Sequence, residues 1–254
     1  MNDTPKKTFY LSPNLLRSLV GAIEDAIGDD IKAIIYGNGL KTTNCRPSLT
    51  WDLINRNLSH SLIPMCETTK FRRGPWDIFV FYDKKSQCVI TLMREERFSG
   101  LCKNQSQRKH YLRLLAHLYN SNLQPKQQGL FDPLPVTPMD EEIAELAKKL
   151  EADINSNNNF IRHHVLILFK TVGFQLTQVR SVMVTPTLDI AVDSEQDLSQ
   201  YIQANESVIV EKVVNPTSPE NQPARGLALK PKALERKHNK LQTKHPDTTT
   251  QKLS

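Results

Sequence analysis

The sequence has no long apolar run of the kind that crosses a membrane. Hydrophobic residues make up 39% of the 254 residues, and no stretch approaches the roughly 18 consecutive apolar residues of a membrane span. The opening residues, MNDTPKKTFYLSPN, contain neither an apolar core nor a small-residue cleavage site, so they predict no secretory signal. We therefore expect a cytoplasmic protein without a membrane partner.

Cysteine is scarce and is not grouped for metal binding. The four cysteines are 21, 22 and 14 positions apart, with no CxxC pair and no Cys/His knuckle, at Cys45, Cys66, Cys88 and Cys102. This spacing favours neither a zinc ribbon nor a disulfide scaffold. We expect reduced thiols and no bound metal or other cofactor.

Signatures of common enzyme classes are also missing. The glycine-containing segment 37–42 lacks the spacing of phosphate-binding loops and predicts a turn. His163 and His164 are adjacent, so on a strand they would point to opposite faces and could not share a metal ion. The sequence contains no GxSxG elbow and no kinase signature. These absences favour a protein without catalytic activity.

The net charge of +6 is distributed unevenly. Residues 225–254 hold eight Lys or Arg residues against two acids, so this tail carries the whole excess and residues 1–224 are neutral overall. Within the neutral part, residues 70–113 have eleven basic residues against four acids, whereas residues 183–222 have seven acids and one lysine. Two such segments either pack against each other or leave a basic face that binds phosphate.

The basic middle segment and the tail are the predicted nucleic-acid contacts, and the partner is DNA or RNA because both present phosphates. In the middle segment the predicted contacts are Arg72, Arg73, Lys84, Lys85, Lys103, Arg108, Lys109 and Arg113. In the tail they are Arg225, Lys230, Lys232, Arg236, Lys237 and Lys240.

The first part of the chain predicts helices and strands in alternation. Ser12 and Pro13 suit the start of an amphipathic helix that ends at Gly28. The apolar run 31–36 predicts a strand, and residues 48–58 predict a shorter helix.

A β-hairpin is the clearest strand signal. Residues 77–83 and 88–94 predict two strands around a four-residue polar loop, in a register that places Asp77 opposite Arg94. Both faces of the hairpin are apolar, so we expect it inside a sheet that is covered on both sides, in part by a helix over residues 105–120.

These patterns predict an α+β protein with four segments. Residues 8–122 form a small mixed sheet with the hairpin 77–94 at its centre and helices beside it. Residues 123–137, rich in Pro and Gln, form a linker. Residues 138–214 form a second, smaller α+β unit, and residues 215–254 form a disordered basic tail. The second unit is expected to contain a helix opened by Thr137 and Pro138, strands at 161–171, 174–184, 187–192 and 207–214, and a short helix at 195–203.

An α-β-β-β-α order with acids beside a hairpin is used by restriction-type nucleases, which hold Mg²⁺ with an Asp and a Glu-x-Lys on neighbouring strands. Here Asp77, Glu95 and Arg97 could meet at one end of the hairpin. The second strand has no Glu-x-Lys inside it, so a cross-strand ion pair between Asp77 and Arg94 is the favoured interpretation. A degenerate or unusual nuclease using Mg²⁺ is the alternative.

One short motif in the linker is specific. Gln127, Leu130 and Phe131 match the pattern Gln-x-x-Leu-Phe, which resembles the pentapeptide that docks bacterial replication and repair proteins on the DNA polymerase sliding clamp. Such a peptide places its Leu and Phe in an apolar pocket while the Gln amide bonds at the rim. The alternative to docking is that Leu130 and Phe131 are buried between the two units.

Residues 10–131 resemble an uncharacterised family of bacterial and prophage proteins of unknown function. The segments that carry this resemblance are GPWDIFVFYDKKSQCVITLMREERF (74–98), HYLRLLAHLYN (110–120) and the QQGLF that follows. The resemblance implies a bacterial or prophage origin and assigns no catalytic residue.

Together the observations predict a non-catalytic protein that works beside DNA or RNA and docks on the sliding clamp. The nuclease is one alternative. A protein-interaction or immunity factor, in which the charged segments have no nucleic-acid role, is another.

Overall fold

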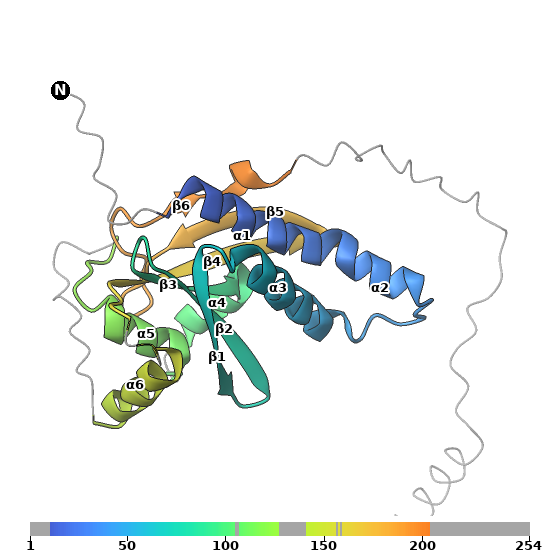
Figure 1. Cartoon of the computed structure of the whole chain (residues 1–254). Coiled ribbons are helices and arrows are strands. Elements are labelled where there is room, and N and C mark those ends of the chain that lie inside the picture. Colours follow the sequence, from blue (N-terminus) through green and yellow to red (C-terminus); the bar gives the residue numbers. More distant parts are fainter. Residues whose placement is uncertain (1–10, 105–106, 127–140, 156, 158, 204–254) are drawn as a thin grey trace, which may run out of the picture. The chain divides into compact units, whose positions relative to one another are not determined.

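The computed structural model of the chain describes residues 11–104, 107–126, 141–155, 157 and 159–203. Six strands form one mixed sheet in the order β1-β2-β3-β4-β5-β6 (Figure 1). Neighbouring strands are antiparallel except β3 and β4, which are parallel. The predicted α+β class is confirmed. The strands are β1 (Cys66–Arg73), β2 (Trp76–Asp83), β3 (Cys88–Arg94), β4 (His163–Val172), β5 (Gln175–Val182) and β6 (Gln196–Asp197).

The first helix, α1 (Pro13–Asp25), begins where the sequence predicts. The Ser12 hydroxyl accepts a hydrogen bond from the Leu15 N–H at 3.3 Å, and Pro13 stands in the first turn, where it needs no donor. The helix does not end at Gly28, because a π-helical turn (Ala26–Asp30) leads directly into α2 (Ile31–Gly37).

The predicted strand at 31–36 is therefore wrong. Ile31 and Ile35, one helical turn apart, are buried, whereas Tyr36 is exposed. A short apolar run fits a buried strand and a helix equally well, and here the helical spacing decides. The turn predicted near Gly39 is confirmed and leads to α3 (Arg46–Leu62), which is longer than the predicted helix at 48–58.

Helices cover both faces of the sheet, as the apolar hairpin predicts. On one face α1 and α3 pack against the buried side chains of Phe81, Ile90, Val165, Ile167 and Phe169. The other face carries α4 (Glu95–Lys103), α5 (Tyr111–Tyr119) and α6 (Glu141–Ile154). The helix predicted over 105–120 begins at Tyr111 because His110 caps it, and α4 is a separate helix that the sequence analysis missed.

Parallel pairing of β3 with β4 joins the two segments that the sequence separated. Residues 88–94 pair with residues 163–169, so strands from 8–122 and from 138–214 lie in one sheet. The described part of the linker also attaches to this unit, since the Lys126 N–H donates to the Ile190 carbonyl at 2.7 Å. All described residues belong to a single compact unit that extends to Ala204.

The hairpin register is correct only near its turn. Phe81 pairs with Ile90 and Asp83 with Cys88 as predicted, but no pairing of β2 with β3 continues upstream of Phe81 among the described residues. Asp77 lies opposite Arg72 of β1 rather than opposite Arg94. Side chains of α5 pack against β1 and β2 in one apolar cluster and against β3 and β4 in another.

Residues 69–80 consequently form a two-stranded ribbon, in which β1 and β2 pair only with each other. The β1–β2 pair extends away from β3, β4 and β5 in Figure 1. Its turn is closed by Gly74, which has φ of +60° and thus a backbone conformation that side chains disfavour.

The remaining predictions for the second segment are mixed. β5 matches the strand expected at 174–184, whereas 187–192 contributes only the single bridges of Ile190 and Ala191. The helix expected at 195–203 is instead β6 and a short 3-10 turn at Ser199–Tyr201. The strand predicted at 207–214 lies outside the described residues.

Candidate nucleic-acid interface

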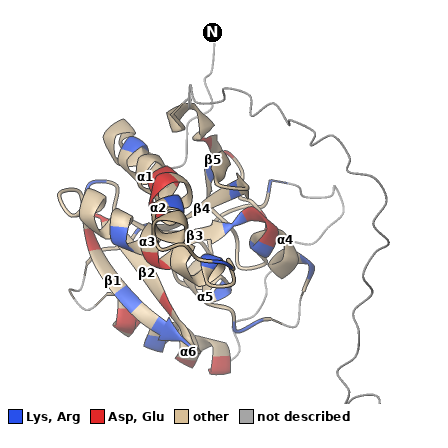
Figure 2. Cartoon of the chain, turned by 90° about the vertical axis from the view of Figure 1, so that its right-hand side faces the viewer, with Lys and Arg blue, Asp and Glu red and all other residues tan. Residues whose placement is uncertain are grey.

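Four arginines from four different segments gather at the start of α5. Arg73 ends β1, Arg97 is on α4, Arg108 precedes α5 and Arg113 is on its first turns. We call these four residues the arginine cluster. Figure 2 shows basic positions on α4 and α5 and on the chain beside them.

Two packing contacts bring these segments together. The ring of Phe71 lies edge-on to Tyr111, with centroids 5.8 Å apart, so the end of β1 meets the start of α5. Phe98 and Leu101 of α4 share a buried cluster with Leu112 of α5. These apolar contacts hold the segments together, and so they keep the arginines close to one another although their like charges repel.

His110 lies within the field of this cluster. Its Nδ1 accepts a hydrogen bond from the Leu112 N–H at 3.2 Å, and its ring lies 4.6 Å from that of Tyr111. Burial is the largest of the causes that lower the pKa of His110 to about 4, and the charges of Arg97, Arg113 and Arg73 add to it. The imidazole is therefore neutral near pH 7, as a helix cap that accepts a hydrogen bond requires.

Arg113 is the anchored member of the cluster. Its side chain is half-buried, and one guanidinium nitrogen donates to the Pro186 carbonyl at 3.2 Å. Burial lowers the pKa of Arg113, whereas the neighbouring Cys102 and Asp189 raise it. This hydrogen bond fixes the position of the guanidinium at the start of α5.

Arg73 and Arg97 are two members of the cluster without an ion pair among the described residues. Neither has a carboxylate within ion-pair distance there, and Arg97 is exposed. By contrast, Lys70 pairs with Asp77 at 3.6 Å and Lys109 pairs with Glu142. Within the described residues, no carboxylate is paired with either arginine.

The structure divides the basic residues that the sequence predicted. Arg73, Arg108 and Arg113 come together, and Arg97, which the sequence analysis assigned to a nuclease site, joins them. Lys84 and Lys85 lie in the turn after β2, at the opposite end of that strand, where Lys84 pairs with Glu67.

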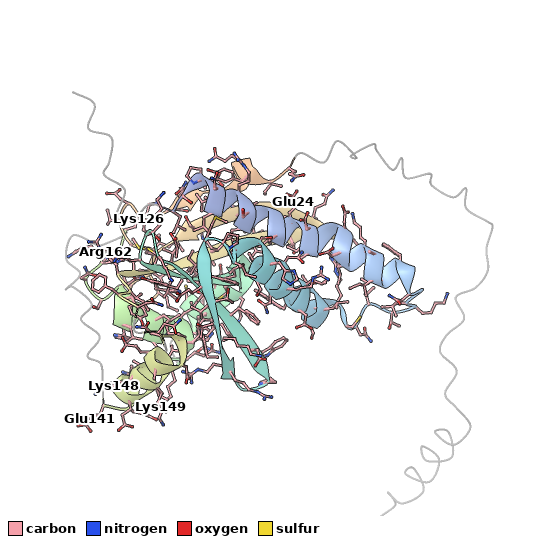
Figure 3. The ribbon with its side chains drawn as sticks, viewed as in Figure 1. Glu24, Lys126, Glu141, Lys148, Lys149 and Arg162 are labelled. Atoms are coloured by element: carbon pink, nitrogen blue, oxygen red, sulfur yellow. The ribbon has the colours of Figure 1, made fainter. Side chains whose placement is uncertain are left out.

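Three further predicted contacts remain outside the cluster. Lys103 is the exposed last residue of α4, and Lys109 pairs with α6 as described above. The side chain of Arg72 donates to the Gly74 carbonyl at 3.3 Å within its own hairpin turn. On α6 itself, Lys148, Lys149 and Glu141 point outward (Figure 3).

The acids of the nuclease alternative have separate partners. Asp77 is 50% exposed and pairs with Lys70 across the ribbon. Glu95 is 13% exposed and accepts two hydrogen bonds from Arg180, at 3.0 and 2.5 Å. The predicted Asp77–Arg94 ion pair is therefore wrong. Asp77 lies in the part of β2 that pairs only with β1, and β2 pairs with β3 only from Phe81 to Asp83.

Glu95 belongs to a chain of ion pairs rather than to a group of metal ligands. Arg180 also binds Glu195 at 2.6 Å, and Lys126 binds the other oxygen of Glu195 at 2.8 Å. Nowhere in the described residues do three or more His, Cys, Asp or Glu side chains gather as a metal site would require. All four cysteines are unpaired, as predicted.

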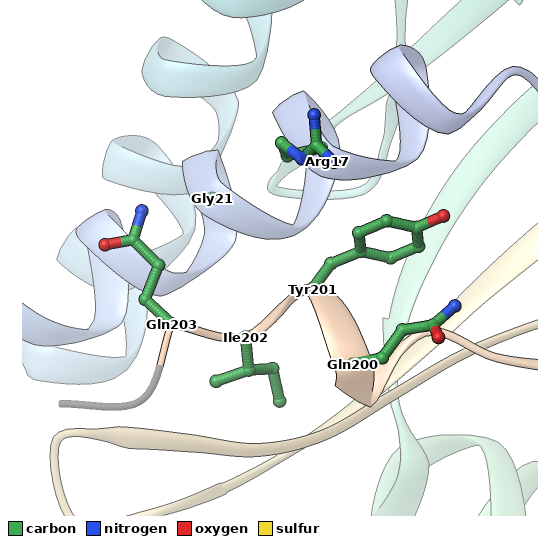
Figure 4. A pocket seen from close by; sticks show the side chains of 6 residues that line it. All are labelled: Arg17, Gly21, Gln200, Tyr201, Ile202 and Gln203. Atoms are coloured by element: carbon green, nitrogen blue, oxygen red, sulfur yellow. The ribbon is translucent and has the colours of Figure 1, made fainter.

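A hollow of about 420 Å³ lies between α1 and the last described residues (Figure 4). It is lined by Arg17, Gly21 and residues 200–203. The Gln203 N–H beside it donates to the Glu24 carboxylate at 3.0 Å. Arg17 is its only charged lining residue.

The clamp motif and the basic tail cannot be placed. Gln127, Leu130 and Phe131, and every tail residue from Arg225 onward, lie outside the described residues. In the part of the chain that the structure describes, no helix has both the length and the apolar character needed to cross a membrane.

Comparison with protein-family models identifies a family over most of the chain. A model of a family of unknown function, DUF5986, matches residues 9–248. No curated protein and no solved structure matches the chain. The predicted resemblance to an uncharacterised family is confirmed, and the match assigns no activity.

Proposed function

The chain belongs to this family of unknown function, and we propose that it binds nucleic acid through the arginine cluster. The observation that carries the proposal is the convergence of Arg73, Arg97, Arg108 and Arg113 from four segments onto the start of one helix. Like charges repel, so a ligand of opposite charge would lower the free energy of such a cluster.

Phosphate is the ligand that this chemistry favours. A guanidinium is always charged and presents a planar fork of donors that matches phosphate oxygens. Arg73 and Arg97 have no acidic partner in the described residues that a phosphate would have to displace. The neutral His110, on which the charges of both arginines act, adds an aromatic ring without adding charge.

The tail supplies a second, less specific contact in this proposal. Its eight basic residues have little apolar support, so they would bind polyanions mainly by releasing counterions.

The clamp motif is the third contact in this proposal. Lys126, just before the motif, is held by Ile190 and Glu195, and α6 begins after it at Glu141, so both flanks of the motif are fixed to the same unit.

Two double variants with the same change in charge test the role of the cluster. Arg73→Gln with Arg97→Gln removes two charges inside the cluster, and Lys84→Gln with Lys85→Gln removes two at the other end of β2. We expect the arginine variant to bind fluorescently labelled DNA or RNA at least about tenfold more weakly, because each lost charge–phosphate contact costs on the order of 1 kcal/mol.

Fluorescence anisotropy at one fixed salt concentration measures both affinities. The lysine variant should lose less than about threefold, since its charges affect a distant phosphate only weakly. Thermal melting of both variants checks that they are folded. Equal weakening by the two variants would show that binding depends on net charge alone, and no binding by the unmodified protein would end the proposal.

A further inference from the structure

The tip of the β1–β2 ribbon exposes a tryptophan beside the arginine cluster. Trp76 is 51% exposed, although a large aromatic side chain is usually buried. It is the first residue of β2 and follows the Gly74 turn, so it sits at the point of the ribbon farthest from β3.

The register fixes which way Trp76 faces. Trp76 pairs directly with Arg73, and side chains directly opposite in an antiparallel pair lie on the same face. Phe71 is two residues before Arg73, so it shares that face, and its ring contacts Tyr111 at the start of α5. The indole therefore lies on the same face of the ribbon as Arg73 and Phe71. This is the face on which Phe71 contacts the start of α5.

A cationic side chain lies directly opposite the indole. It belongs to Arg73, and the charges of Arg73 and Arg97 both reach His110. An apolar protein partner would have to desolvate these guanidinium groups, which costs free energy. A ligand that combines a flat π surface with phosphates satisfies both the indole and the arginines.

We propose that Trp76 stacks on an unpaired base of a single-stranded nucleic acid whose backbone is held by Arg73 and Arg97. This inference rests on the function proposed above and specifies its ligand. Bases of a single strand can turn outward onto an aromatic ring, whereas bases of a duplex are already stacked on each other. Rings on a rigid ribbon bind such bases without regard to sequence.

Tryptophan fluorescence tests this contact directly, because the chain has only two tryptophans. Trp51 packs edge-on against Phe169 with centroids 5.7 Å apart, so it is far less accessible than Trp76. In the full-length Trp51→Phe variant the emission comes from Trp76 alone. The probe is a thymidine homopolymer of about 15 nucleotides, close to the upper site size of single-strand binding modules.

We expect the homopolymer to quench the Trp76 emission, with the same midpoint as binding measured by anisotropy. A blunt duplex of equal length should bind more weakly and quench less. Trp76→Ala, made in the otherwise unmodified chain, should weaken binding of the single strand by about 5- to 100-fold, as loss of one base stack does. Phe160→Ala is the matched control, because Phe160 is 67% exposed and belongs to no arginine cluster.

The outcomes separate this inference from the function on which it rests. If Trp76→Ala binds the single strand as the unmodified protein does, while Arg73→Gln with Arg97→Gln loses binding, the stacking contact is wrong and nucleic-acid binding stands. Equal binding and equal quenching by the duplex would also overturn it. If the unmodified protein binds neither probe, both proposals fail. Should Trp51→Phe not fold, the affinity of Trp76→Ala decides alone.

Discussion

His164 shows how the interior of the sheet holds a titratable side chain. It is fully buried on β4, with Nε2 2.8 Å from the Thr91 hydroxyl of β3. The side chain of Asn120 accepts from the His164 N–H at 3.0 Å and donates to the His164 carbonyl at 2.8 Å. Burial lowers the pKa of His164 to about 3, so the imidazole is neutral in the folded protein near pH 7.

We expect acid to destabilise the protein through this residue. The pKa of histidine in an unfolded chain is about 6.5, so between this value and about 3 the unfolded state binds a proton that the folded state does not. Stability therefore falls as the pH drops through this window, by about 1.4 kcal/mol per pH unit for one histidine. Urea unfolding at several pH values within it measures the slope.

The double variant Thr91→Val with His164→Leu is the control for this prediction. It replaces both hydrogen-bond partners with apolar side chains of similar size, so no buried polar group of the pair is left unsatisfied. Its slope should be smaller than that of the unmodified protein. Other groups whose pKa is lowered in the fold keep the remainder, namely the histidines His110 and His163 and the acids Glu67, Glu195 and Asp197. An unchanged slope would mean that His164 is protonated in the folded state.

Asp77 and Glu95 should respond differently to removal of their charge. Asp77→Asn should change the free energy of unfolding by less than about 0.5 kcal/mol, because its pair with Lys70 is exposed. Glu95→Gln should cost about 1 to 3 kcal/mol, since Glu95 is mostly buried and accepts two hydrogen bonds from Arg180.

The same two variants test the nuclease alternative. If Asp77 and Glu95 bound Mg²⁺, the purified protein would cleave DNA or RNA with Mg²⁺ or Mn²⁺, and either variant would abolish cleavage. We expect no metal-dependent cleavage that depends on both residues. Cleavage lost in both variants would establish the alternative and refute a purely structural role for Glu95.

At the scale of helices and strands, local patterns predicted the elements whose signals were periodic or capped. The start of α1 followed from Ser12 and Pro13, and the hairpin followed from two apolar runs around a polar loop. β1 was missed because Glu67, Thr68, Thr69 and Lys70 leave its apolar pattern weak, although its pairing with β2 forms the ribbon.

The missed elements explain why the candidate site was only partly predicted. Arg108 and Arg113 were named from charge alone, but Arg97 was read as a strand end because α4 was not recognised. Trp76 could not be identified, since it lies in the part of β2 that does not pair with β3, and a local pattern does not show where that pairing ends. The apolar residues on both faces of the hairpin predicted a sheet covered on both sides. The parallel β3–β4 pairing could not be predicted, because it joins residues too far apart in the sequence for a local pattern to show it.

The linker motif makes a prediction at this scale. A synthetic peptide spanning residues 124–135 should bind a bacterial sliding clamp at about micromolar strength or weaker, because a short flexible ligand loses ordering entropy on binding. Leu130→Ala with Phe131→Ala should abolish that binding, as titration of the clamp with both peptides would measure.

The same double change in the whole protein distinguishes docking from burial. A docking motif leaves the melting temperature unchanged. Truncation of two large buried side chains would instead cost at least about 4 kcal/mol and lower the melting temperature markedly. A silent peptide together with a destabilised protein would refute the docking motif.

At the scale of the whole molecule, residues 1–224 are neutral overall and include the arginine cluster, whereas residues 225–254 carry the net charge of +6. We expect deletion of residues 225–254 to weaken nucleic-acid binding and to flatten its salt dependence, because each phosphate contact releases counterions. The melting temperature should change little. A salt dependence that survives the deletion unchanged would remove the tail from the interface.

The salt dependence of binding by the two double-charge variants tests the arginine cluster most directly. For each lost phosphate contact, the slope of log K against log salt concentration decreases by about 0.7 for a single strand and about 0.9 for a duplex. Arg73→Gln with Arg97→Gln should therefore reduce the slope by about 1.4 to 1.8. The slope should stay nearly constant for Lys84→Gln with Lys85→Gln. A slope that is unchanged in the arginine variant, or reduced equally in both, would contradict nucleic-acid binding by the cluster.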